Sequence, residues 1–224
     1  MSRLSLGNKA VLKQYIDEEG NVDYTRLRND PWLEEQLLYI RETNPDDLET
    51  QKEKFAFWLN AYNLLTLEGV LEELEKRPQW SGNTSFLSKV KFFVLKRFAV
   101  GGRKLSLRTL ENKIIREKFQ DPRIHFAINC GSASCPVLPG RLFQAEELDE
   151  TLELLTDNFI NNPNHVQFDS STNVLTLNPI FKWYHKDFRP KGVIAFIKCY
   201  WRGLDLPDNL KVNYSTYDWS LNKQ

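Results

Sequence analysis

The stretch that decides the fold is Phe55-Ala56-Phe57-Trp58-Leu59-Asn60-Ala61-Tyr62-Asn63-Leu64-Leu65. Apolar side chains cover nearly the whole circumference of a helix over these positions, so we expect a buried central helix. Upstream, Asn44-Pro45-Asp46-Asp47 places a capping asparagine, a proline and two acids where a helix begins. The pattern predicts a helix that starts there and runs, with a break, to about Glu75.

The composition indicates a folded domain rather than a disordered or nucleic-acid-binding chain. The chain has 224 residues, of which 41% are hydrophobic and 12% aromatic, enough for a substantial core. Thirty basic residues balance thirty acidic ones, so the sequence does not have the basic excess typical of nucleic-acid-binding proteins. At about 150 residues per domain, and with no repeat or linker, residues 1–224 are predicted to form a single domain.

The sequence also predicts where the protein resides. The apolar run 55–70 is interrupted by polar residues, so it is not expected to span a membrane, and residues 1–5 do not begin a secretory leader. Three cysteines are an odd number and no disulfide framework; Cys130 and Cys135 could pair across a short turn, but so small a loop would add little stability. We therefore expect a soluble, cytoplasmic protein in a reducing compartment.

Helical segments outnumber strands in the rest of the chain, which predicts an α+β class with a small antiparallel sheet around the central helix. A helical extension, residues 1–45, is expected to pack on the body, and the aromatic tail 217–222 is expected to dock on it. The predicted helices are 8–17, 31–43, 106–119, 145–161, 179–187 and 191–202, and the predicted strands are 92–100 and 103–106 around Gly101-Gly102, 123–129, and 166–168 and 174–177.

Glu111 is the first candidate functional residue. It lies four residues after Leu107 and four before Ile115, on the apolar stripe of the predicted helix 106–119. A carboxylate there must find a partner or lose its charge, because an unpaired buried charge costs several kcal/mol. Glu111 is therefore either half of a structural ion pair or the group that orients a catalytic imidazole.

His125 is the candidate imidazole. In the predicted strand 123–129 it shares one face with Ala127 and Asn129, because side chains alternate along a strand. A single histidine in a strand is commonly a core residue, but this one directly precedes Cys130-Gly131-Ser132-Ala133-Ser134-Cys135-Pro136. That position favours a general base next to a thiol.

Cys135 is the preferred nucleophile. Pro136 suits the first position of a helical turn, which would place the Cys135 thiol at the positive end of the helix and favour the thiolate. Cys130 is the rival, with a small buried apolar residue as its alternative role. Backbone N–H groups of residues 130–135, with the Asn129 side chain, are expected to form an oxyanion hole.

A zinc site at the two cysteines is an alternative that the spacing of the residues does not favour. His125, Cys130 and Cys135 are three possible soft ligands, but the gap between the thiols is wider than in zinc knuckles and a fourth ligand is not evident. His165 and His185 do not obviously converge with them. The sequence predicts no metal and no cofactor, and the C-x-x-C spacing of redox dithiols is absent.

Asn60 and Asn63 complete the candidates. They are three residues apart on the otherwise apolar central helix, so they share a face and need hydrogen-bond partners. They either tie a loop to the core or, together with Asn129 and Cys130, contact a substrate beside the thiol.

Several segments together resemble the family known as domain of unknown function 547. The similarity extends from about residue 50 to 222, and the segments appear in the family's order. They are FWLNAYN (57–63), LRTLE (107–111) leading to IR (115–116), DPRIHFAINCGS (121–132) with SCP (134–136), IFKWY (180–184), DF (187–188) and YDWSLN (217–222). The family often has histidine where this chain has Asn112, so we assign no role to that position.

The resemblance implies a fold and an activity. The family is similar to papain-like cysteine peptidases, which implies a papain-like fold and a Cys-His-Glu triad. By position, the acid is Glu111, the base His125 and the thiol Cys135, with Cys130 second. Papain-like enzymes carry the thiol on the central helix, where this chain has asparagines, and the family is sometimes fused to other modules.

Two functions follow from these observations. The first is a cysteine hydrolase that cleaves a peptide or amide substrate through an acyl-enzyme on Cys135. The second is a non-catalytic interaction module in which the polar cluster is structural and exposed aromatic residues bind a partner. An open cleft shared by Glu111, His125 and a thiol favours the first, and sulfurs bonded to each other favour the second.

Overall fold

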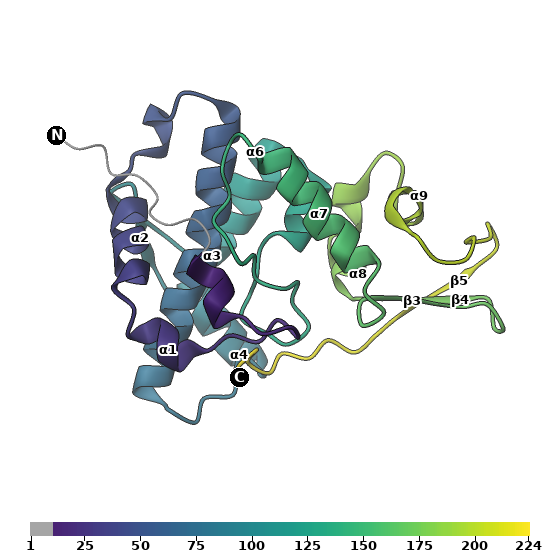
Figure 1. Cartoon of the computed structure of the whole chain (residues 1–224), viewed down its shortest axis with the longest axis horizontal. Helices are drawn as coiled ribbons and strands as arrows, with labels where there is room; N and C mark the ends of the chain where they lie inside the picture. Colours follow the sequence, from purple (N-terminus) through teal and green to yellow (C-terminus); the bar gives the residue numbers. More distant parts are fainter. Residues whose placement is uncertain (1–10) are drawn as a thin grey trace.

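The helix α3 (Gln51–Lys76) is the element around which the computed structural model, which describes residues 11–224, is organised (Figure 1). It begins with a capping box, in which the side chains of Thr50 and Glu53 satisfy each other's backbone N–H groups. The predicted break separates it from a 3-10 turn, η2 (Pro45–Asp47), which Asn44 caps. The predicted buried central helix is confirmed: side chains on all its faces are buried over residues 55–67.

The N-terminal elements contribute side chains to the apolar cluster around α3, and α2 contacts α3 directly. They are η1 (Val11–Tyr15), α1 (Tyr24–Arg28) and α2 (Pro31–Glu42), and α2 confirms the helix predicted at 31–43. Of the helix predicted at 8–17, residues 11–15 form a 3-10 helix. Its first residues, like the N-terminal segment 1–5, lie outside the described part of the chain.

The first hairpin is shorter than predicted. Strands β1 (Phe98–Val100) and β2 (Arg103–Leu105) pair around the Gly101-Gly102 turn, as expected, but residues 92–95 are helical. They belong to the π-helical η3 (Val90–Leu95), which continues the helix α4 (Phe86–Lys89). The helix forms because Ser85 and Ser88 build a capping box at its start, a signal that the apolar run 92–95 obscured.

The predicted helix 106–119 is confirmed and carries Glu111. It comprises α5 (Leu107–Thr109), a π-helical middle η4 (Leu110–Arg116) and α6 (Glu117–Phe119). Ser106 caps its start. The wider π-helical turn alters which side chains share a face, so Glu111 lies at the edge of the buried stripe rather than within it.

The strand predicted at 123–129 is wrong. Its residues form a 3-10 helix, η5 (Pro122–Phe126), followed by a turn. Asp121 accepts a hydrogen bond from the backbone N–H of Arg123, and Pro122 occupies the first helical position. This helix-start signal outweighs the alternating apolar pattern. Because the segment is not a strand, the prediction that His125 and Asn129 lie on the same face of a strand is wrong as well.

The C-terminal half carries the second sheet. Strands β3 (Val166–Asp169) and β4 (Val174–Leu177) form the predicted antiparallel hairpin, but β5 (Lys211–Tyr214) adds to it in parallel. The predicted single antiparallel sheet is therefore two separate small sheets, one of them mixed. The helices of this half are α7 (Leu148–Ile160), α8 (Ile180–Trp183), η6 (His185–Phe188) and α9 (Val193–Tyr200).

The tail connects the two halves, as the yellow segment of Figure 1 shows. After β5 the chain runs back to the helical half, where Ser220 and Leu221 pair with Gly82 and Ser132. One apolar cluster surrounds α3, and a second surrounds α8 and the mixed sheet. The class is confirmed as helix-rich α+β with small sheets. Within residues 11–224, the helices are all too short or too polar to cross a bilayer.

Candidate active site

A pocket of about 160 Å³ lies where the two apolar clusters meet. All four residues predicted around the thiol chemistry, Glu111, His125, Cys130 and Cys135, line it. The remaining lining is mostly aromatic and comes from both halves of the chain: Tyr62, Phe93, Ile128, Pro136, Ile180, Trp183, Tyr184, Tyr217 and Trp219. A larger groove of about 560 Å³ reaches Asp187 from another side but includes none of those four residues.

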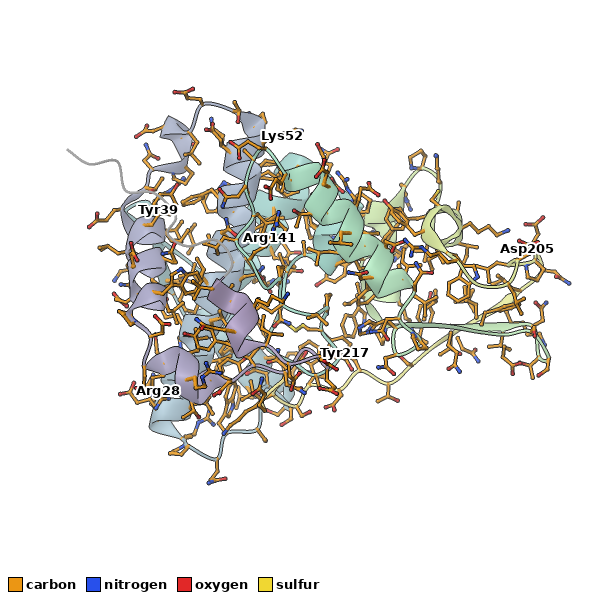
Figure 2. All side chains as sticks on the ribbon, viewed as in Figure 1. Arg28, Tyr39, Lys52, Arg141, Asp205 and Tyr217 are labelled. Atoms are coloured by element: carbon orange, nitrogen blue, oxygen red, sulfur yellow. A yellow bond between two sulfur atoms is a disulfide. The ribbon has the colours of Figure 1, made fainter. Side chains whose placement is uncertain are left out.

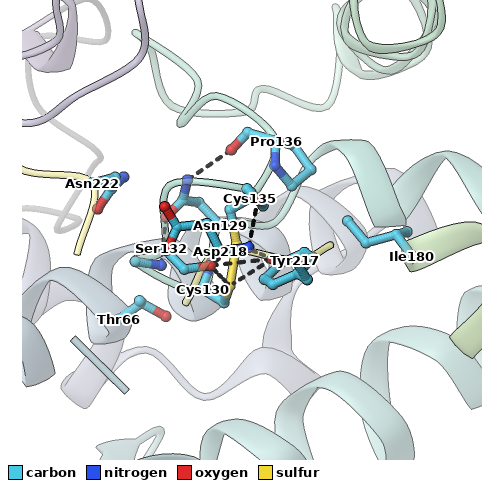
Figure 3. The surroundings of a disulfide bond; sticks show 12 residues. Thr66, Asn129, Cys130, Ser132, Cys135, Pro136, Ile180, Tyr217, Asp218 and Asn222 are labelled. Carbon is cyan, nitrogen blue, oxygen red and sulfur yellow. Dashed lines mark hydrogen bonds between the residues drawn. A yellow bond between two sulfur atoms is a disulfide. The ribbon is translucent and has the colours of Figure 1, made fainter. Parts of the chain in front are cut away.

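The two sulfurs of the pocket are bonded to each other. Cys130 and Cys135 form a disulfide across the turn, as Figure 3 shows, whereas the third cysteine, Cys199, is free and exposed. The expectation of free thiols at both positions is therefore wrong for the form described. Cys135 is buried and Cys130 half-buried, so the disulfide forms part of the pocket wall.

Hydrogen-bond donors surround the sulfur of Cys135. The backbone N–H of Cys130 lies 2.9 Å from Sγ, the hydroxyl of Tyr217 lies at 3.2 Å and that of Ser132 at 3.5 Å (Figure 3). Burial raises the pKa of Tyr217, so its hydroxyl keeps its proton and can donate. Donors of this kind would stabilise a thiolate more than a thiol if the disulfide were reduced.

Two predicted features of this turn are absent. A helix does not begin at Pro136: residues 136–144 are irregular, because Pro139 disfavours helical backbone before it and Gly140 follows. The backbone N–H groups of Cys130, Gly131 and residues 133–135 already bond within the protein. These five N–H groups are therefore not free to bind an oxyanion, and the Tyr217 hydroxyl is a further donor beside the sulfur.

His125 is held by a carboxylate that was not predicted. Its Nε2 lies 2.8 Å from Oδ2 of Asp187, which also forms a bidentate pair with Arg116 at 2.7 and 3.0 Å. The ring of Tyr184 stacks on the imidazole, with 4.1 Å between centroids. His125 is 3% exposed, so packing and this hydrogen bond together fix its orientation.

The protonation state of this pair follows from its surroundings. Burial lowers the pKa of His125, although the bond to Asp187 acts in the opposite direction. Burial favours neutral Asp187, but the hydrogen bonds from His125 and Arg116 outweigh it and hold its pKa well below the usual range. A neutral imidazole facing an ionised carboxylate donates from Nε2 and keeps the lone pair on Nδ1, the state that a general base needs.

Glu111 does not hold the imidazole. Its carboxylate accepts hydrogen bonds from the hydroxyls of Tyr184, at 2.5 Å, and Tyr62, at 3.4 Å. Burial, reinforced by the charge of Glu111, raises the pKa of both tyrosines, so both remain donors. The structure therefore corrects the predicted role: Asp187 bonds to His125, whereas Glu111 bonds to Tyr184, whose ring stacks on the imidazole, and acts on His125 only through its charge. It is not a structural ion pair either, since within residues 11–224 a basic side chain does not lie within 4 Å of its oxygens.

Aromatic rings form the outer wall of the pocket. Trp183, Tyr217 and Trp219 pack together with centroid separations of 4.7–5.8 Å. Trp183 is 46% exposed, so this wall borders solvent. Figure 2 shows Tyr217 near the middle of the molecule, on the segment that links its two halves.

The three predicted asparagines brace loops and do not line the pocket. Asn60 exchanges two hydrogen bonds with the backbone of Phe143. Asn63 bonds to the carbonyl of Ala127 and to the N–H of Asn129, and the Asn129 side chain bonds to the turn at Gly131 and Pro136. We call Asn60, Asn63 and Asn129 the asparagine brace. These bonds fit the structural interpretation of the three residues, and the predicted substrate contact stays a prediction.

The described residues do not contain a group of three or more histidines, cysteines and acids that could hold a metal. His165 stacks on Phe159 in the second apolar cluster, where burial lowers its pKa to about 4, and His185 is exposed. Neither lines the pocket.

Sequence reasoning missed Asp187, Tyr184, Tyr217, Trp183 and Trp219 as site residues. All five lie in the C-terminal segments that carried the family resemblance, and that resemblance is the signal that could have identified them. Their distance in sequence from Cys135 hid the contact, because local periodicity contains no information about which distant segments meet.

Comparison with family models matches residues 45–160 to the family described as "Protein of unknown function, DUF547". The predicted resemblance is thereby confirmed, although the C-terminal motifs lie outside the matched residues. The curated proteins contain no match, and neither do the solved structures.

Proposed function

This chain belongs to the DUF547 family, and we propose that its pocket is the active site of a cysteine hydrolase that cleaves a peptide or amide bond through Cys135. The observation that carries the proposal is the surroundings of the Cys135 sulfur. Three donors surround it, and a buried histidine with its own carboxylate lines the same pocket. This combination of nucleophile, base and orienting acid is the arrangement that cysteine hydrolases use.

The reaction begins from the reduced protein. A thiol reductant breaks the Cys130–Cys135 bond, supplying two electrons and two protons and becoming a disulfide itself. His125 then takes the Cys135 proton, and the sulfur attacks the carbonyl carbon while the C=O electron pair moves to oxygen. The Tyr217 hydroxyl, 3.2 Å from the sulfur, is the donor placed to stabilise that oxygen.

Breakdown of the tetrahedral intermediate completes the acylation step. The C–N bond breaks, His125 returns its proton to the leaving amine, and a thioester remains on Cys135. Water then attacks the thioester, with His125 as the base, and releases the acid and the thiol. Asp187 keeps the Nε2 proton in place throughout. In this proposal the fold is a papain-like arrangement in which the thiol lies on a loop rather than on α3, and the enzyme acts in a reducing compartment such as the cytoplasm.

The disulfide itself favours a second candidate, a non-catalytic interaction module. In this alternative the bond between Cys130 and Cys135 closes the turn permanently, and the pocket serves only to bind a partner. The two candidates differ in what happens when Cys135 is freed.

A pair of serine variants separates them. In a Cys199→Ser background, which removes the exposed thiol, Cys130→Ser frees Cys135 and Cys135→Ser frees Cys130. We expect iodoacetamide to alkylate the Cys130→Ser protein rapidly near neutral pH, and His125→Ala to shift that reaction to higher pH. We also expect Cys130→Ser to cleave members of a peptide library without reductant, whereas the parent needs reductant and Cys135→Ser stays inactive.

If freed Cys135 reacts only at the pH of an ordinary thiol and no peptide is cleaved, the hydrolase proposal fails and the interaction module stands. Cleavage by Cys135→Ser but not by Cys130→Ser would make Cys130 the nucleophile. Circular dichroism of each variant confirms that it is folded before it is assayed.

A further inference from the structure

The aromatic pocket contains one carboxylate, that of Glu111, among the lining residues that the structure describes, and it contains no lysine or arginine. Two cations lie on rings that line the pocket, and each is already engaged. Arg116 pairs with Asp187 and lies 4.8 Å from the centroid of the Tyr184 ring, and Lys89 lies 3.8 Å from the centroid of the Trp219 ring. A carboxylate among aromatic faces is the surrounding in which proteins bind organic cations.

Glu111 also has hydrogen-bonding capacity left. A carboxylate offers about four acceptor positions, and the hydroxyls of Tyr184 and Tyr62 use two of them. These two bonds fix the orientation of the carboxylate before a ligand arrives, which lowers the entropic cost of binding. The remaining positions fit a primary ammonium group, which has three N–H donors.

The aromatic wall completes the site. The rings of Trp183, Tyr217 and Trp219 give an apolar surface for the methylene chain that carries the ammonium group. Trp183 is exposed to solvent, and Glu111 lines the same pocket, where it accepts a hydrogen bond from Tyr184. A long, flexible side chain that ends in a charge can contact both the aromatic wall and the carboxylate.

We propose that this pocket binds an alkylammonium side chain of the lysine type, with Glu111 as the anionic contact and Trp183 as part of the wall. As a statement about the substrate it rests on the proposed function: the peptide or amide that Cys135 cleaves carries a lysine-like group next to the scissile bond. As a statement about binding it does not require the thiol to react.

The test therefore uses the disulfide-bonded protein, in which Cys135 cannot attack. Titration calorimetry compares Nα-acetyl-lysine methylamide with the norleucine analogue, which lacks the ammonium group. We expect the lysine ligand to bind at least about tenfold more tightly to the parent, and Glu111→Gln to remove that difference. Glu117→Gln is the matched control, because Glu117 is exposed on the same helix and lies outside the pocket.

Trp183→Leu gives a second variant that does not disturb the core, since this side chain is 46% exposed. We expect it to weaken the lysine ligand about threefold. Equal binding of the two ligands to the parent, or an unchanged preference in folded Glu111→Gln, overturns the proposal. If Cys130→Ser cleaves peptides without a preference for lysine, the hydrolase proposal holds and the cation-site proposal is wrong. If the lysine ligand binds but no peptide is cleaved, the cation-site proposal holds and the hydrolase proposal is wrong.

Discussion

Two polar clusters of this molecule differ in what their side chains bond to: the asparagine brace, which is buried, and the partly buried pocket cluster of His125, Asp187, Glu111 and the Cys130–Cys135 disulfide. In the brace, the amides of Asn60, Asn63 and Asn129 bond to backbone groups. In the pocket cluster, the carboxylates of Asp187 and Glu111 bond to other side chains, and Glu111 retains acceptor capacity beside a cavity. Groups satisfied by backbone stabilise the fold, whereas groups held by side chains at a cavity are available to a ligand.

The largest effect that we expect is the loss of peptide cleavage when Asp187, in the pocket cluster, is replaced. Asp187→Asn removes the acceptor that fixes the His125 tautomer, and the equivalent change in a serine protease lowers the rate by about 10⁴-fold. In the Cys130→Ser protein we expect peptide cleavage to fall by about 10³-fold or more, worth about 4 kcal/mol. The measurement is kcat/KM, with Asp208→Asn, an exposed aspartate paired with Lys198, as the control.

If kcat/KM of the Asp187→Asn variant stays within a few-fold of that of the Cys130→Ser protein, the contrast between the two clusters is wrong. That result would mean that Asp187 and His125 are a structural pair, like the members of the brace. A urea titration of the same variant separates the two cases, because a purely structural pair shows its whole effect in the free energy of unfolding.

The brace should show its effect in stability. Asn63→Ala leaves the carbonyl of Ala127 and the N–H of Asn129 buried without a partner, at about 1–3 kcal/mol each. We expect urea denaturation to give a loss of about 3 kcal/mol in the free energy of unfolding. Asn164→Ala, at an exposed position, should change it by less than about 0.5 kcal/mol. Equal losses in the two variants would show that the brace has no special role.

A smaller effect is expected in the pH dependence of the free energy of unfolding. The asparagine brace contains no ionisable group and cannot contribute to it, whereas a buried histidine can. Burial lowers the pKa of His165 to about 4, below its value of 6.5 in the unfolded chain. As the pH falls, the unfolded chain therefore takes up the proton first, so this contribution to stability is present above pH 6.5 and is lost between pH 6.5 and 4. His165 is partly accessible, so we expect a loss of about 2 kcal/mol rather than the full linkage value.

The check is urea denaturation at several pH values. His165→Gln should flatten the dependence between pH 6.5 and 4, whereas His185→Gln, at an exposed position, should leave it unchanged. Parallel curves for the parent and His165→Gln would contradict the assignment.

The elements that could be predicted from the sequence were those with strong local signals. The apolar circumference of 55–65, the glycine pair at 101–102 and the cap at Ser106 each identified an element that the structure contains. The 123–129 prediction failed because the Asp121-Pro122 start signal outweighed an apolar alternation that a short buried 3-10 helix also produces.

The residues of the candidate site also fall into a group that the sequence predicted and a group that it did not. Cys130, Cys135 and His125 could be found because they are close in sequence, and the stripe argument singled out Glu111. The partners of these residues could not be assigned: Asp187 replaced Glu111 as the acid on His125, and Tyr217 donates to the sulfur from the C-terminal tail. Those contacts depend on how the second half of the chain packs on the first, which no local pattern contains.

The smallest effect concerns the hydroxyl that holds Glu111. Tyr184→Phe removes the 2.5 Å bond to the carboxylate but keeps the ring that stacks on His125. Glu111 would then be less rigidly oriented, and we expect Nα-acetyl-lysine methylamide to bind about threefold more weakly, with cleavage of lysine-free peptides unchanged within about twofold. Calorimetry and kcat/KM measure the two. If cleavage falls as much as lysine binding, the tyrosine hydroxyl serves His125 rather than the cation site, and the pocket is one catalytic network instead of a base beside a separate binding wall.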